Sequence, residues 1–145
     1  MRKDKTAAAL RNDRITAAIF IAVIMCAIAA GFDYYYDLND DVLMKDILAG
    51  IYTGTPETHN IQMLWPVSAF ISLLYSVCPA VPWMGTVLCL FQYGCLYMIV
   101  CRTLSFFEKK RTRALMLFVS AALIFSYLLE HLVFIQYTVT AAIMA

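Results

Sequence analysis

The chain has 145 residues, of which 63% are hydrophobic and 14% are charged, with a formal net charge of +1. Soluble domains are about half apolar and about a quarter charged, so this composition excludes an ordinary soluble domain. Long uninterrupted apolar runs exclude a membrane β-barrel, whose strands alternate over short segments. The composition therefore predicts an all-α, polytopic helical membrane protein.

The basic residues flank the apolar runs and are not interleaved with exposed aromatic residues, so no nucleic-acid partner is expected. The cysteines fit no metal-site spacing, and we expect them to pack as small apolar side chains. They are Cys26, Cys78, Cys89, Cys95 and Cys101.

The first predicted transmembrane helix covers residues 15–32 and follows a basic segment, residues 1–14. These 18 residues just reach the length that crosses a hydrocarbon core of about 30 Å. The preceding Lys and Arg residues place the N-terminus in the cytoplasm. A cleaved signal peptide is the alternative, because Ala27-Ile28-Ala29 has the form of a cleavage site.

The charge distribution decides how the next apolar stretches are placed. If residues 63–78 crossed the membrane, the basic cluster in residues 102–113 would lie outside, against the positive-inside rule. Serines recur every four residues in this stretch and prolines flank it, so it is predicted to be an interfacial helix.

The complete prediction is about four transmembrane helices in the plasma (inner) membrane, and it places ten of the eleven Lys and Arg residues inside. An outer loop with interfacial helices covers residues 33–82, and its first tyrosines, Tyr34, Tyr35 and Tyr36, are expected to form an aromatic belt at the interface. The later segments are a transmembrane helix at residues 83–101, a cytoplasmic basic loop at 102–114, a transmembrane helix at 115–131 and the start of a fourth at 137–145.

The outer loop contains an acidic pair in the sequence Asn39-Asp40-Asp41. Asn39 can cap a helix, the acids suit the first turn of that helix, and Gly50 can end it. Adjacent carboxylates at a membrane face also suit an enzyme that needs a base or a cation ligand there. The residues alone leave helix capping and a catalytic site as alternatives.

Two further stretches follow the acidic pair in a characteristic order: residues 44–52, which end in Gly50-Ile51-Tyr52, and residues 63–75, which begin Met63-Leu64-Trp65-Pro66. In this order they resemble the first outer loop and second span of the GT-C superfamily of integral membrane glycosyltransferases. The likeness is greatest to the protein mannosyltransferase and aminoarabinose transferase branch. In that branch an Arg often begins the second span, where this chain has Trp83.

The resemblance implies transfer of a sugar from a polyprenyl-phosphate donor to an acceptor at the outer membrane face. It implies that an Asp of the first loop is the general base, with Asp41 slightly preferred to Asp40. A positioned carboxylate makes a hydroxyl nucleophilic by taking its proton. Alternatively, the pair could hold a divalent cation against the lipid phosphate. No dedicated metal site and no other cofactor are expected.

Three further residues are candidates for substrate binding: His59 in the outer loop, and Glu130 and His131 at the outer end of the third transmembrane helix. A lone loop histidine is usually only solvated. Ionisable residues near a span are functional hypotheses by default. With the helix that begins at Tyr137, these residues are expected to line one site on the outer face.

Enzymes of this superfamily are several times longer, and this chain stops within an apolar stretch. We therefore expect an N-terminal fragment that is inactive alone, or a chain that needs a second chain to complete the fold. The alternative function is a small non-enzymatic polytopic membrane protein, such as an accessory or assembly subunit. A transporter is disfavoured, because the span centres carry few polar or helix-breaking residues besides Gln92 and Gly94.

Overall fold

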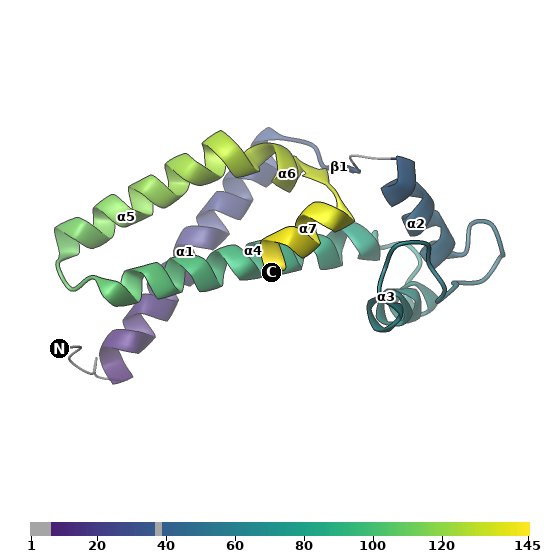
Figure 1. The fold of residues 1–145 in the computed structure, drawn as a ribbon, viewed down its shortest axis with the longest axis horizontal. Helices are drawn as coiled ribbons and strands as arrows, with labels where there is room; N and C mark the ends of the chain where they lie inside the picture. Colours follow the sequence, from purple (N-terminus) through teal and green to yellow (C-terminus); the bar gives the residue numbers. More distant parts are fainter. Residues whose placement is uncertain (1–6, 37–38) are drawn as a thin grey trace. The chain divides into compact units, whose positions relative to one another are not determined.

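The computed structural model describes residues 7–36 and 39–145 (Figure 1), and confirms the predicted all-α class. The only strands among the described residues form one short parallel pair, in which Tyr35 is opposite Phe134. The elements are α1 (Ala7–Gly31), β1 (Tyr35–Tyr36), α2 (Asn39–Ala49), α3 (Trp65–Val77), α4 (Trp83–Phe106), α5 (Lys110–Leu123), the π-helix η1 (Ile124–Leu128), α6 (Leu129–Val133), β2 (Phe134–Ile135) and α7 (Tyr137–Met144).

The chain forms two compact units. The first unit contains α1, the second part of α4, and α5 to α6, within the described part of Met1–Asp33 and in Tyr93–Val133. The second contains β1, α2, α3, the beginning of α4, β2 and α7, within Tyr34–Gln92 and Phe134–Ala145.

Three helices of the described chain are long and apolar enough to cross a membrane: Leu10–Gly31, Trp83–Phe106 and Lys110–Val133. The second and third contain the predicted spans 83–101 and 115–131 and extend them, whereas the first begins five residues before the predicted span 15–32 and ends one residue earlier. The extensions have a physical cause, since Lys and Arg are good helix formers that can carry a helix beyond its apolar part. The loop predicted at residues 102–114 is therefore mostly helical, and only residues 107–109 lie between α4 and α5.

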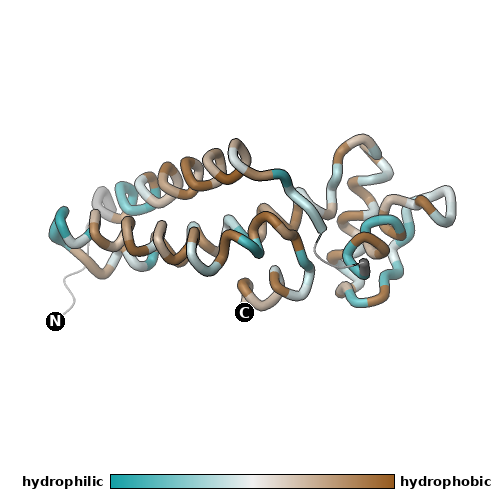
Figure 2. Tube along the Cα trace, turned by 90° about the horizontal axis from the view of Figure 1, so that it is seen from above, coloured by the Kyte–Doolittle hydropathy of each residue, from teal (hydrophilic) through white to brown (hydrophobic). Residues whose placement is uncertain are grey.

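The first unit leaves many apolar side chains exposed. On α1 the buried residues Ala17, Ile21, Ile24 and Ile28 form one stripe at helical spacing. Outside this stripe, α1 exposes apolar side chains such as Val23, which is 61% exposed. Figure 2 shows hydrophobic residues along most turns of α4 and α5, with hydrophilic residues gathered where α4 ends and α5 begins.

Helix α2 begins at Asn39 and ends before Gly50, as the sequence predicts. The side chain of Asn39 lies outside the described residues. Gly50 has a φ of +75°, and the backbone N–H groups of Gly50 and Ile51 donate to the carbonyls of Ile47 and Asp46 at 3.0 and 2.9 Å. These two bonds form a Schellman motif, which satisfies carbonyls that a helix end leaves without partners.

Helix α3 has 13 residues and is therefore about 20 Å long, too short to cross a hydrocarbon core of about 30 Å. This length agrees with the prediction that residues 63–78 do not form a span. Its serines Ser68 and Ser72 lie on the buried face with Ile71 and Tyr75. The opposite face is apolar and exposed, at Phe70, Leu73 and Val77.

The core of the second unit joins α2, α3, the first turns of α4 and β2. Its buried members are Met44, Leu48, Met63, Ile71, Tyr75, Met84, Val87, Leu88 and Ile135. This core fixes α2 and α3 against the start of α4, and it determines where the acidic pair lies.

Candidate functional site

The two acids of α2 lie in different environments although they are neighbours in sequence. Asp40 is exposed, and one of its carboxylate oxygens accepts a hydrogen bond from the Gln62 amide at 3.4 Å. Asp41 is only 2% exposed, and its Oδ1 accepts a hydrogen bond from the backbone N–H of Tyr137 at 2.9 Å. The difference follows from helix geometry, because successive residues point about 100° apart.

Asp41 acts as a cap for α7. The Tyr137 N–H is one of the donors that the first turn of α7 leaves without an intrahelical partner. Gln136, the N-cap residue of α7, makes no side-chain cap hydrogen bond, and Asp41 supplies the acceptor from α2 instead. A carboxylate at this position also interacts favourably with the dipole of α7.

The start of α7 also contacts the segment that leads into α3. The hydroxyl of Tyr137 accepts a hydrogen bond from the backbone N–H of Leu64 at 3.4 Å. Within the second unit, the structure therefore brings together the acidic pair, Gln62 and the first residue of α7. The sequence predicted the nearness of the outer loop and this helix, but not the bonds that produce it.

His59 lies in the loop between α2 and α3, and its side chain is 83% exposed. Its Nδ1 is 3.0 Å from the Glu57 carboxylate, which also accepts backbone hydrogen bonds from His59 and Thr58 at 3.1 and 2.8 Å. These hydrogen bonds lower the pKa of Glu57, and the bond to the His59 ring contributes most. Within the described part of the chain, His59 pairs with Glu57 and not with the acids of α2.

Glu130 and His131 lie in α6, where Glu130 is exposed and His131 is partly buried. They belong to the first unit, whereas the acidic pair and the start of α7 belong to the second.

Two phenols, the partly buried Tyr36 and the buried Tyr75, cap the first turn of α4, and sequence reasoning missed both roles. The Tyr36 hydroxyl accepts from the Gly85 N–H at 3.0 Å, and the Tyr75 hydroxyl accepts from the Met84 N–H at 3.3 Å. Burial is the main cause that raises the pKa of both phenols, and the nearby Tyr75 and Asp41 add to it at Tyr36. Both groups are therefore neutral hydrogen-bonding groups at physiological pH.

Two of the three tyrosines predicted for the aromatic belt have exposed side chains. Tyr34 and Tyr35 are exposed, and the Tyr35 ring stacks on Phe134 with centroids 6.0 Å apart. Tyr36 points inward, because successive residues of an extended segment face opposite sides and Tyr35 faces outward. The sequence does not show which tyrosine is turned inward, because all three positions carry the same residue.

A second polar contact joins α7 to α4. The Gln92 amide donates to the Thr140 hydroxyl at 2.8 Å, and that hydroxyl donates to the Gln136 carbonyl at 2.8 Å. Gln92 and Thr140 are both fully buried. This contact gives Gln92 a structural role.

The described residues contain no group of three or more His, Cys, Asp or Glu side chains that could hold a metal ion. The chemistry available to the cluster itself is acceptance of a proton by the exposed Asp40 carboxylate.

Comparison of the chain with protein-family models, curated proteins and solved structures gives no match.

Proposed function

We propose that this chain provides the acidic first loop of a membrane glycosyltransferase, which moves a sugar from a polyprenyl-phosphate donor to an acceptor hydroxyl at the outer membrane face. The observation that carries the proposal is the exposed Asp40 carboxylate at the N-terminus of α2, in a folded loop between two helices apolar enough to span. The order of motifs after the acidic pair supports it, as does the length of α3. The loop faces outward and the N-terminus lies in the cytoplasm.

Asp40 is the general base in this proposal, and Asp41 is a positioning residue. A base must reach the proton that it abstracts. Asp41 is buried and its Oδ1 is bonded to Tyr137, whereas Asp40 is exposed. This assignment reverses the slight preference for Asp41 that the sequence suggested.

The reaction needs one group from this chain, the Asp40 carboxylate, as the proton acceptor. The acceptor oxygen bonds to the anomeric carbon of the sugar as the bond from that carbon to the phosphate oxygen breaks. Asp40 takes the hydroxyl proton, and polyprenyl phosphate leaves. The amide of Gln62 holds the Asp40 carboxylate in place.

The test uses native membranes, where any chain that acts with this one is present. Turnover of radiolabelled polyprenyl-phosphate hexoses is measured with the wild-type chain, without the chain, and with single variants at equal protein level. Loss of a general base lowers a rate by about 10²- to 10⁴-fold. We therefore expect Asp40→Asn to lower turnover by at least about 100-fold.

Asp41→Asn and Asp46→Asn are the matched controls on the same helix. Asn keeps an acceptor oxygen for the Tyr137 N–H, so we expect Asp41→Asn to lower turnover by less than about tenfold. Asp46 pairs with Lys45 at 2.7 Å, and its replacement is expected to have little effect. Turnover that does not depend on the chain, or that survives Asp40→Asn, would contradict the proposal.

The second candidate is a non-enzymatic accessory protein that uses the outer loop for interaction. The cap that Asp41 supplies to α7 favours it, because this bond explains one of the two acids without any chemistry. In that case Asp40→Asn is harmless. Asp41→Ala, which removes the acceptor, then lowers the protein level by destabilising the second unit.

A further inference from the structure

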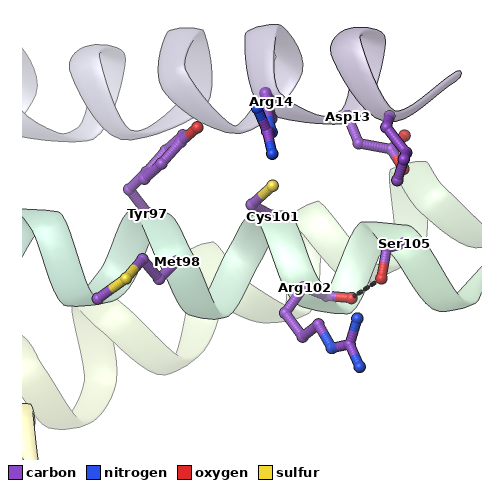
Figure 3. A pocket seen from close by; sticks show the side chains of 8 residues that line it. Asp13, Arg14, Tyr97, Met98, Cys101, Arg102 and Ser105 are labelled. Atoms are coloured by element: carbon purple, nitrogen blue, oxygen red, sulfur yellow. Dashed lines mark hydrogen bonds between the residues drawn. The ribbon is translucent and has the colours of Figure 1, made fainter. Parts of the chain in front are cut away.

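The first unit contains a pocket of about 410 Å³ between the basic ends of α1 and α4 (Figure 3). Arg14 extends from α1 toward α4 beside Cys101, and the Tyr97 ring extends from α4 toward α1. Leu10 and Met98 add apolar walls. The pocket thus combines a guanidinium, a phenolic hydroxyl and an apolar surface.

The charge of this pocket is positive. Asp13 lies in its wall, but it forms an ion pair with Arg113, so its charge is compensated. Arg14 forms no ion pair with another described residue. Arg102 also lines the pocket, but its guanidinium extends away from α1 (Figure 3) and lies over the Phe106 ring, with its central carbon 5.0 Å from the centroid, so Arg14 is the cation that faces the pocket.

The pocket lies near one end of the first two candidate spans. Arg14 is four residues from Leu10, which begins the first candidate span, and Arg102 is four residues from Phe106, which ends the second. At 1.5 Å per residue, each is about 6 Å from the end of its span. A phosphate at the membrane surface can reach this level, and the acyl chain attached to it would meet the apolar walls.

We propose that this pocket binds the phosphate of an anionic phospholipid headgroup. Basic pockets between transmembrane helices bind such headgroups. The fork of Arg14 matches two phosphate oxygens, and the Tyr97 hydroxyl can donate to a third. The site is independent of the proposed glycosyl transfer, since it uses neither the acidic pair nor any residue of the second unit.

The test measures lipid retention by native mass spectrometry. The full chain is reconstituted in vesicles of equal parts phosphatidylglycerol and phosphatidylcholine, and the ratio of the two lipids that stay bound is recorded. Arg14→Gln is compared with Arg111→Gln, which removes the same charge from an exposed residue that is not part of the pocket wall. One basic residue near an anionic surface changes binding about fivefold.

We expect Arg14→Gln to lower the phosphatidylglycerol ratio by about fivefold or more, and Arg111→Gln by less than about twofold. Equal losses in the two variants would overturn the proposal, because they would show a diffuse surface effect. An unchanged ratio in Arg14→Gln would overturn it as well. Displacement of the lipid by millimolar inorganic phosphate would show that free phosphate is the ligand, and would also contradict it.

Tyr97→Phe provides a second measurement if Arg14→Gln does not fold, as judged by circular dichroism. This variant removes only the hydroxyl, and one lost hydrogen bond lowers the ratio by about two- to tenfold. A ratio equal to that of the wild type would then overturn the proposal.

Discussion

At the residue scale, Asp40 and Asp41 show how little adjacency in sequence says about environment. The rotation between them places Asp40 in solvent and Asp41 against the start of α7. A hydrophobicity profile treats the two acids alike. The division of labour proposed for them rests on this difference.

Gly50 gives a sharp prediction at the same scale. A Cβ built at this position would lie 2.3 Å from the backbone carbon of Thr55, and the positive φ disfavours any L side chain. We expect Gly50→Ala to lower the free energy of unfolding by about 2 kcal/mol or more. Denaturation of the purified chain in detergent, followed by circular dichroism, measures this change.

Gly54 is the matched control for Gly50. Its φ is +76°, but a Cβ there would meet nothing within 4 Å. Gly54→Ala should therefore lose only the backbone preference, about 1–2 kcal/mol, and less than Gly50→Ala. Equal losses in the two variants would show that the close approach of Thr55 has no energetic weight.

At the element scale, α3 combines a short length with two opposite faces. Ser68 and Ser72 lie on its buried face, where they permit close packing, and Phe70, Leu73 and Val77 make its exposed face apolar. Leu73 and Val77 on that face are 61% and 78% exposed. Such a helix is stable in water only at a cost, whereas at a membrane surface the apolar face is covered by lipid.

We therefore predict that the exposed face of α3 contacts lipid. A nitroxide attached at Leu73→Cys, in a chain without other cysteines, should be relaxed more strongly by oxygen than by a water-soluble nickel complex. The reverse is expected at Glu57→Cys in the preceding loop. If the nickel complex is the stronger relaxer at position 73, the helix faces water and its apolar side needs another explanation.

At the scale of the whole molecule, the charges are distributed unevenly along the chain. The predicted topology places ten of the eleven Lys and Arg residues inside, with Lys45 as the exception, and the outer loop holds six of the ten acids. Such an imbalance normally fixes the orientation of a membrane protein, because basic residues are retained in the cytoplasm.

This imbalance predicts that residues 57 and 107 lie on opposite sides of the membrane. In intact cells, a membrane-impermeant maleimide should label Glu57→Cys and leave Phe107→Cys unlabelled. Permeabilised cells serve as the control, since both sites should react there. Labelling of position 107 in intact cells would reverse the topology and remove the outer acidic pair on which the proposed function depends.

The sequence by itself determined the helical class, the three long apolar helices, and the start and end of α2. These features depend on hydropathy and on caps, which act between neighbouring residues and can be read along the chain. It also predicted a short helix in residues 63–78, because length and flanking prolines are local properties as well.

Only the tertiary structure decided which acid is buried, why Tyr36 points inward, and what Gln92 does. The partners of these residues are far away in the chain: Asp41 and Tyr137 are 96 positions apart, and Gln92 and Thr140 are 48 apart. Such pairs form when the core of the second unit places β1, α2, α4 and α7 together. No local pattern records them, because a hydrogen bond across elements depends on packing rather than on the neighbouring residues.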